Sequence, residues 1–270
     1  MKKYFFIKSI SIFIIIAFAL FFCCIYISQN KSKDIYKYSE IQIPLEAKIL
    51  WDNSTLKNIS VKYKGNDTID AYIFPSANGR TLLINPPIDG FTEGSKIYVT
   101  LSPNLHFKNY ELKSKKRLRF NVKSDNLSAL SKVSRIPKYG DIIGTTDNFM
   151  GYRYNHYGIY IGNNKVIHYC SSTGNAKDAK IQETNMAPYF KPGNYFILNV
   201  KSNVEFSSEE TVRRARTRLG EKSYSLLQNN CEHFALWAKT GNSKSYQLIN
   251  LSQKELAQIK MFTAMGINLQ

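Results

Sequence analysis

The sequence predicts a chain of three parts: a single transmembrane helix, an all-β sandwich and an α+β domain. Three observations support this fold class. An uncharged apolar run covers residues 9–30, short β-type segments alternate with turn residues between 41 and 123, and from Tyr139 strand patterns are followed by two helical patterns. We therefore expect five segments: a membrane anchor at 1–35, the sandwich at 36–125, a linker at 126–135, the α+β domain at 136–250 and a tail at 251–270.

The apolar run near the N-terminus predicts a membrane helix. It follows Lys2, Lys3 and Lys8 and is long enough to cross a hydrocarbon core of about 30 Å. A cleaved signal peptide is the alternative, but aromatic residues stand where its small cleavage-site residues belong, at 21–26. Lysines also follow the run, so charge gives only a weak orientation signal. We expect an uncleaved, single-pass helix in the cell membrane, with the bulk of the chain outside.

Positive charge is the main compositional signal. The chain has 37 Lys and Arg against 20 Asp and Glu, a formal net charge of +17, which favours a polyanionic partner. An outside location excludes nucleic acid, so we expect membrane phospholipid or a cell-wall polymer; the oligomeric state stays open. A basic stretch at 105–138 is either a solvated edge strand and linker or a surface that docks on anionic lipid heads or teichoic-type polymers.

Short β-type segments fill the region before residue 125. Turn residues separate them, among them Asn78-Gly79, which is a hairpin signal, and no helical periodicity interrupts them. This pattern predicts a small antiparallel sandwich. Its expected strands are 47–51, 59–63, 71–74, 81–85, 97–101 and 118–122.

The α+β domain begins with strands expected near 141–143, 156–161, 166–170 and 195–200. Two helices follow. Ser207 and Glu210 form a capping box for the first. The second begins at Asn229-Asn230, runs from Cys231 to about Lys239 and ends before Gly241.

Cys231 is the candidate nucleophile. In the first turn of a helix its sulfur faces unpaired N–H groups and the positive end of the helix dipole, and both favour the thiolate. Residues at i+3, i+4 and i+7 from Cys231 are apolar, which predicts that this helix face is buried. An inert buried cysteine, or a disulfide with Cys170, is the alternative.

Two histidines lie in adjacent predicted strands. Strand side chains alternate between faces, so the length of the connecting loop decides whether His156 and His168 meet. A three-residue loop at 162–164, with Asn164 at positive φ, would place His168 opposite Gly158 on the face of His156. A two-residue turn would point the two rings to opposite faces.

These residues resemble a known family. The segment His156-Tyr157-Gly158-Ile159-Tyr160-Ile161-Gly162 through His168, followed by Asn230-Cys231-Glu232-His233-Phe234, is similar to the lecithin:retinol acyltransferase (LRAT) family of the NlpC-like, circularly permuted papain superfamily. The resemblance covers roughly residues 135–248 and implies a permuted papain-like fold for the α+β domain. The preceding region, through its Gly94–Leu101 strand, resembles bacterial Ig-like domains of surface-layer proteins, which implies a spacer or binder.

The LRAT resemblance implies a role for each site residue. Cys231 would be the nucleophile, His156 the general base, His168 the polar third member, and Tyr154 a group that helps hold the developing oxyanion. By its helical position His233 points away from Cys231, so we expect it to be structural, and we expect Glu232 to interact with the helix dipole. No cofactor is expected, and a zinc site of His156, His168 and Cys231 lacks a recognisable fourth ligand.

Three functions are compatible with these residues. The first is a thiol-dependent acyltransferase or lipid hydrolase of the bacterial cell envelope that forms an acyl-thioester on Cys231. The second is a peptidoglycan peptidase or amidase of the NlpC type, whose cleft should be polar and open where a lipid enzyme has an apolar groove. The third is a non-catalytic envelope binding protein with a vestigial triad.

Overall fold

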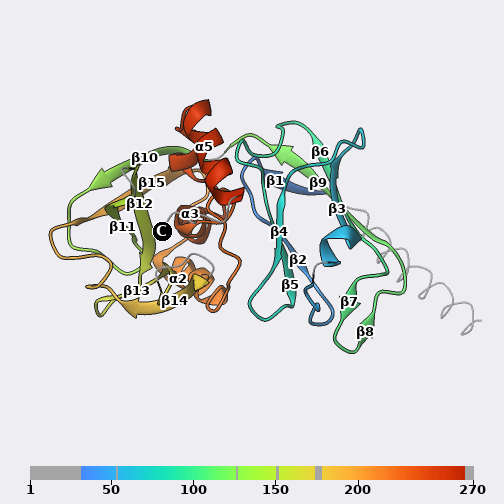
Figure 1. Ribbon diagram of the computed structural model, residues 1–270, viewed down its shortest axis with the longest axis horizontal. Coiled ribbons are helices and arrows are strands. Elements are labelled where there is room, and N and C mark those ends of the chain that lie inside the picture. The colour runs from blue at the N-terminus through green and yellow to red at the C-terminus, as the bar shows by residue number, and fades with distance from the viewer. Residues whose placement is uncertain (1–31, 53, 126, 150–151, 174–177, 265–270) are drawn as a thin grey trace, which may run out of the picture.

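The chain forms two lobes that lie side by side (Figure 1). A computed structural model describes residues 32–264 except 53, 126, 150–151 and 174–177. The elements of the N-terminal lobe are β1 (Lys33–Tyr36), β2 (Ile41–Pro44), the 3-10 helix η1 (Thr55–Asn58), β3 (Ile59–Tyr63), β4 (Tyr72–Pro75), β5 (Thr81–Asn85), β6 (Lys96–Leu101), β7 (His106–Phe107), β8 (Tyr110–Glu111) and β9 (Lys116–Lys123).

Two sheets of the N-terminal lobe share one hydrophobic core. One sheet has the order β1-β9-β6-β3 and the other β2-β5-β4. Alternate residues of each strand are buried, as the pattern of β9 shows, where Phe120 and Val122 point inward between exposed basic residues. The inward residues of both sheets form a single cluster, so the lobe is a β-sandwich.

Most strands expected in this lobe are present. Strands β3 and β5 coincide with the predicted segments, and the Asn78-Gly79 signal is confirmed as the turn between β4 and β5, with Gly79 at a φ of 69°. The segment expected at 47–51 is no strand and makes one isolated bridge, between Ile49 and Phe107. The Ig-like resemblance stays a prediction.

The C-terminal lobe is built on a six-stranded sheet in the order β10-β15-β11-β12-β13-β14. Its elements are β10 (Leu127–Val133), β11 (Ile142–Phe149), β12 (Tyr152–Tyr160), β13 (Lys165–Cys170), β14 (Lys180–Asn185), β15 (Tyr195–Ser202), α2 (Ser208–Thr217), α3 (Cys231–Thr240), α4 (Tyr246–Ile249) and α5 (Gln253–Ala264). Helix α3 contacts β11, β12, β13 and α2, so it is enclosed between the sheet and a second helix.

Both predicted helix starts are confirmed. The side chain of Ser207 accepts a hydrogen bond from the backbone N–H of Glu210 at the start of α2. Asn230 caps α3, and Gly241 ends that helix in the left-handed conformation with a φ of 82°.

The predicted α+β class is wrong, because strands far outnumber helices among the described residues. The linker expected at 126–135 contains β10, which pairs with β15, and β14 adds another edge strand. Neither sequence, LSALSKV or KIQETN, shows the regular apolar alternation from which strands are predicted, and the second is mostly polar. The division of the chain into five segments stays a prediction.

The membrane-spanning part of the fold class and the single-pass localisation are also corrected. In the part of the chain that the structure describes, no helix combines the length and the apolar character needed to cross a bilayer. The run at 9–30, on which the prediction rests, lies outside the described residues.

A buried charge network joins the two lobes. Arg218, at the end of α2, is 3% exposed, and its guanidinium donates to Glu221 at 2.6 and 2.7 Å and to Asn229 at 3.0 Å. It also reaches Glu40 of the N-terminal lobe at 3.3 Å. Burial raises the pKa of Glu40, and the charge of Arg218 opposes that rise. The cation therefore balances two buried carboxyl groups that come from different lobes.

The N-terminal lobe also holds the loop that leads into α3. The amide of Asn85 donates to the carbonyl oxygen of Gln228 at 2.8 Å, and the hydroxyl of Tyr72 donates to that of Ser223 at 3.3 Å. Because this loop ends at the cap of α3, the sandwich contributes to the position of that helix.

Replacing Arg218 by alanine should strongly destabilise the chain. The variant leaves Glu40 and Glu221 buried without their cation, and such a loss costs about 3–5 kcal/mol of unfolding free energy. Denaturant unfolding measures the change. Arg213→Ala is the matched control, because its ion pair with Glu210 on the same helix is exposed, so it should leave the stability nearly unchanged. Equal midpoints for the two variants would contradict the structural importance of the network.

Candidate active site

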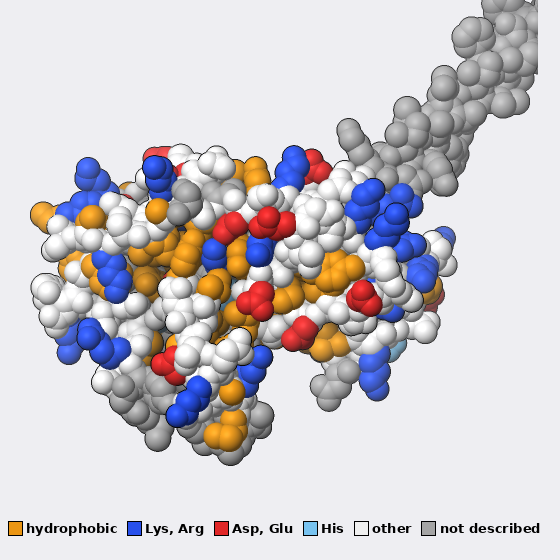
Figure 2. Space-filling model, turned by 90° about the horizontal axis from the view of Figure 1, so that it is seen from above, with side chains coloured by type: hydrophobic (Ala, Val, Ile, Leu, Met, Phe, Trp, Pro, Cys, Tyr) orange, Lys and Arg blue, Asp and Glu red, His pale blue; other side chains and the backbone are white. Residues whose placement is uncertain are grey.

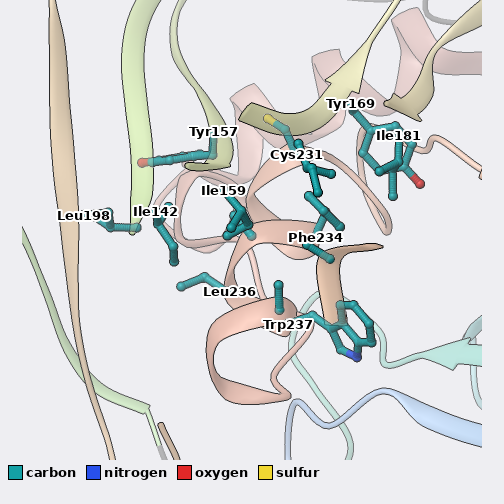
Figure 3. Packing of buried hydrophobic residues seen from close by; sticks show 14 of the residues in the cluster. Ile142, Tyr157, Ile159, Tyr169, Ile181, Leu198, Cys231, Phe234, Leu236 and Trp237 are labelled. Carbon is teal, nitrogen blue, oxygen red and sulfur yellow. The ribbon is translucent and has the colours of Figure 1, made fainter. Parts of the chain in front are cut away.

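Cys231 is the first residue of α3, and the cap of the helix fixes its position. The side chain of Asn230 accepts hydrogen bonds from the N–H groups of Glu232 and His233, at 3.0 and 3.1 Å. The ring of His233 accepts in return from the N–H of Asn230 at 3.2 Å. Figure 3 shows Cys231 at the start of the helix, above Phe234 and beside the residues of β12. His233 is therefore a capping residue, as its helical position predicts.

The hairpin of β12 and β13 brings the two histidines to one face of the sheet. Gly162, Asn163 and Asn164 all have positive φ, at 83°, 50° and 54°, and His168 pairs opposite Gly158. The three-residue loop and its register are thus confirmed. A Cβ atom on Gly158 would lie 3.0 Å from the Cβ of His168, so glycine leaves the room that the second ring needs.

The two imidazoles are in direct contact. His156 Nε2 lies 2.8 Å from His168 Nδ1, and His168 Nε2 lies 2.9 Å from the hydroxyl oxygen of Thr184. One tautomer assignment leaves Nδ1 of His156 unprotonated: its Nε2–H donates to His168, whose own Nε2–H donates to Thr184. The geometry therefore permits His156 to accept a proton at Nδ1. Thr184 was not predicted, because it lies in β14, a strand whose polar sequence gave no signal.

Burial keeps both rings neutral. It lowers the pKa of His156 to about 4, a shift that Asp147 opposes, and lowers the pKa of His168 well below its ordinary value, with His156 adding to the effect. Phe190 stacks on His156 with ring centroids 5.5 Å apart, and Tyr189 meets the His168 ring edge-on at 4.5 Å. These aromatic rings cover part of each imidazole, while His156 also lines the cavity beside Cys231.

The resting state of Cys231 differs from the expected thiolate. Burial raises the pKa of its thiol to about 12, and the backbone N–H of Tyr157 and the first N–H groups of α3 only partly oppose this rise. The carboxyl of Glu232 raises it further. The helix terminus favours a thiolate as predicted, but burial outweighs it. Near pH 7 the site holds a neutral thiol beside a neutral imidazole.

Tyr154 lies on the same face of β12 as His156, two residues away, and both line one cavity with Cys231. Burial raises the pKa of Tyr154 to about 12, and the charges of Asp147 and Cys231 add to this rise. The phenol is therefore protonated near pH 7 and can donate a hydrogen bond. The four predicted residues are thus assembled in one place, and their catalytic roles stay proposals.

A clamp that the sequence did not predict holds β12 against α3. The side-chain amide of Gln247 donates to the carbonyl oxygen of Asn155 at 3.0 Å and accepts from the N–H of the same residue. The N–H of Gln247 donates to Glu232 at 3.1 Å, and the hydroxyl of Ser245 donates to that carboxyl group at 2.6 Å. Since Asn155 precedes His156 and Glu232 follows Cys231, the clamp sets His156 and Cys231 relative to each other.

Glu232 thus has a different surrounding from the one expected. It is 1% exposed and burial raises its pKa, so it is no solvated first-turn charge. The sequence carried no sign of Gln247, because the partners of this clamp are far apart along the chain.

The cavity beside Cys231 has a volume of about 420 Å³. One part of its wall is apolar and is formed by residues of α4, of α5, of the link between them and of the turn before α3: Leu248, Ile259, Leu251 and Leu226. Thr145, Asp147 and Arg153 supply a polar part. Within the described residues, no group of three or more His, Cys, Asp or Glu side chains is arranged to hold a metal ion.

Comparisons with known proteins agree with this geometry. The sequence model of the family described as "Lecithin retinol acyltransferase" matches residues 135–244. The lecithin retinol acyltransferase of Homo sapiens is 29% identical over 118 residues, which cover 34% of this chain and 51% of that protein. The Rattus norvegicus protein is 28% identical, and the match covers 52% of its length. The chain therefore spans about half the length of the acyltransferases it matches.

Two solved structures of the surface layer protein SbsC are also similar to this chain. They have 14% and 16% sequence identity and a TM-score of 0.32, and each match covers 62% of this chain and 24% of the other. A TM-score this low supports no statement about fold or function.

A further relative covers more of its own length. The "Phospholipase A and acyltransferase 2" of Homo sapiens is 30% identical over 127 residues, which cover 42% of this chain and 76% of that protein. The family match coincides with the lobe that holds Cys231, His156 and His168. Through this lobe, the chain belongs to the lecithin retinol acyltransferase family.

Proposed function

We propose that the chain is a cysteine-dependent acyltransferase or lipid hydrolase that takes the acyl group of a phospholipid ester onto Cys231. The single observation that carries this proposal is the apolar wall of the cavity beside the thiol. Leu226, Leu248 and Leu251 offer an acyl chain a surface that a peptide or glycan would not need. The names of the relatives, acyltransferases and a phospholipase A, support the same reaction class.

The first step is attack of the Cys231 sulfur on the ester carbonyl carbon. Because the thiol is protonated at rest, its proton passes to Nδ1 of His156 as the carbon–sulfur bond forms. The imidazolium that results is held by His168, whose Nδ1 accepts from the Nε2–H of His156. The phenol of Tyr154, which lines the same cavity, donates to the oxyanion and lowers the energy of the tetrahedral intermediate.

The second step releases the alcohol part of the phospholipid. His156 returns its proton to the leaving oxygen as the carbon–oxygen bond breaks, and the acyl group remains as a thioester on Cys231. Water or an alcohol or amine acceptor then gives its proton to His156 and attacks the thioester, which regenerates the thiol. Hydrolysis and acyl transfer therefore differ only in the second nucleophile.

Intact-mass spectrometry of the full chain with phosphatidylcholine micelles tests the proposal. A fatty-acyl mass increment should appear on the wild type and be absent from Cys231→Ala. Cys170→Ala is the matched control, because Cys170 is also buried and lines the same cavity, and it should still be acylated. Cleavage of peptidoglycan fragments without an acyl increment would overturn the proposal in favour of a peptidase, and no reaction with either substrate would favour a binding protein.

The pH dependence should report the buried base. A His156 whose pKa is lowered from 6.5 to about 4 is neutral, and thus competent, above about pH 5. We expect kcat/KM to be level from there to neutral pH and to fall tenfold per pH unit below about 4. Tryptophan fluorescence over the same range controls for unfolding. An acid limb near pH 6.5 in folded protein would contradict the neutral, desolvated His156.

Gln247→Ala should slow the reaction without changing the reacting groups. Loss of the clamp on Asn155 displaces His156 relative to Cys231, and a misplacement of about 1 Å costs on the order of 100-fold in rate. We expect kcat to fall and KM to stay nearly constant. Asn250→Ala, an exposed change at the end of the same helix, is the control and should retain full activity. An unchanged kcat in the Gln247 variant would show that the clamp has no positioning role.

A further inference from the structure

The outer face of the β1-β9-β6-β3 sheet carries charge of almost one sign. Strand alternation places Lys62 of β3, Lys96 of β6, and Arg117 and Arg119 of β9 on this face, while the opposite face is apolar core. Asp34 also lies on this side, but it is already paired with Lys123 at 2.8 Å. Figure 2 shows Lys and Arg side chains gathered at the end of this lobe that lies away from the C-terminal lobe.

A hollow of about 450 Å³ follows the central strand of this face. Tyr98 and Thr100 of β6 form its floor, Lys62 and Lys64 line one side, and Lys115 and Arg117 line the other. Its lining includes no Asp or Glu. Within the described residues, none of these four cations has a carboxylate within ion-pair distance. Ordinary solvated sheet faces mix both signs of charge, so this arrangement calls for an anionic ligand.

The shape of the hollow limits the kind of anion. Lys62 and Arg117 stand on the two strands that flank β6, and neighbouring strands are about 4.8 Å apart, so the backbones that carry these cations are roughly 10 Å apart. A row of cations at this spacing suits one extended polymer chain with anionic groups along its length. A flat bilayer surface would lie across the rims of the hollow without filling it.

The floor of the hollow argues against nucleic acid. The guanidinium of Arg117 lies 4.1 Å from the centre of the Tyr98 ring and covers its outer face. Tyr63, another lining residue, follows Lys62 in β3, so its ring points to the opposite face and packs against the core. No open aromatic face is therefore left in the lining on which a base could stack. Hydroxyl groups of Ser60 and Thr100 suit a polyol or sugar instead.

We propose that this hollow, lined by Lys62, Lys64, Lys115 and Arg117, binds a linear polyol-phosphate or sugar-phosphate polymer. The cations contact successive phosphates, and the hydroxyl-bearing floor contacts the units between them. Arg117 is held in place by its stacking on Tyr98, so less side-chain freedom is lost when it binds phosphate. The site lies in the lobe that does not contain Cys231, and the proposal is independent of the reaction at that residue.

Binding of the full chain to poly(glycerol phosphate), measured by fluorescence anisotropy at several salt concentrations, tests the proposal. Replacing Lys62, Lys64, Lys115 and Arg117 by glutamine should weaken binding by at least about tenfold. The slope of log Kd against log salt should flatten by roughly 2 to 3, as expected from losing about four phosphate contacts.

The matched control removes the same formal charge elsewhere, by changing four exposed lysines of the C-terminal lobe, Lys138, Lys180, Lys191 and Lys222, to glutamine. It should bind nearly as tightly as wild type. An equal loss in both variants, or no binding by wild type, would overturn the proposal. Tighter binding to phosphatidylglycerol vesicles than to poly(glycerol phosphate) would also overturn it, because such vesicles offer the same glycerol phosphate in a flat array. Tighter binding to single-stranded oligothymidine would do the same. If the fourfold variant fails to fold, Lys64→Gln with Lys115→Gln replaces it, since both side chains are exposed.

Discussion

The ion pairs of Arg218 are the interactions on which the rest of the structure depends. The guanidinium is shared by Glu40 of one lobe and by Glu221 and Asn229 of the other. Asn229 precedes the residue that caps α3, and its amide also donates to the hydroxyl of Tyr169, which lies next to His168 in β13. Helix α3 begins with Cys231, and β13 carries His168. Through Asn229, hydrogen bonds connect both elements to the buried guanidinium of Arg218.

Burial also determines the protonation states of Cys231 and His156, as a comparison of two free energies shows. A helix N-terminus stabilises an anion by at most about 2 kcal/mol. The rise in the pKa of Cys231 from 9.0 to about 12 corresponds to roughly 4 kcal/mol in the opposite direction. Desolvation is therefore a larger effect than the helix N-terminus, and the thiol stays protonated near pH 7. The same desolvation keeps His156 unprotonated, so one physical effect makes both groups neutral near pH 7.

Local signals in the sequence predicted the local geometry of the candidate site well. The cap and length of α3 follow from Asn230 and Gly241, and the facing of His156 and His168 follows from an odd loop length and an adjacent glycine. These features depend on residues that are close along the chain. Thr184, Gln247 and Arg218 could not be found in the same way, because each acts through a partner on another element.

The sequence was least informative where a strand carries no apolar alternation. Strands β10 and β14 form the edges of the sheet through backbone hydrogen bonds, which any residue can make. Their side-chain patterns therefore did not predict them. The helix dipole argument for Cys231 failed for a related reason. A sequence shows which group occupies a helix terminus but not how completely the fold then removes water from it.

The Gly162-Asn163-Asn164 loop has a consequence for how such a protein can change over generations. Hairpin loops usually accept insertions and deletions readily, because they lie at the surface and their cost is small. Here a gain or loss of one residue would reverse the facing of every side chain in β13 and carry His168 away from His156. Substitutions in this loop are limited by its positive φ angles, whereas its length is limited by the contact between the two imidazoles.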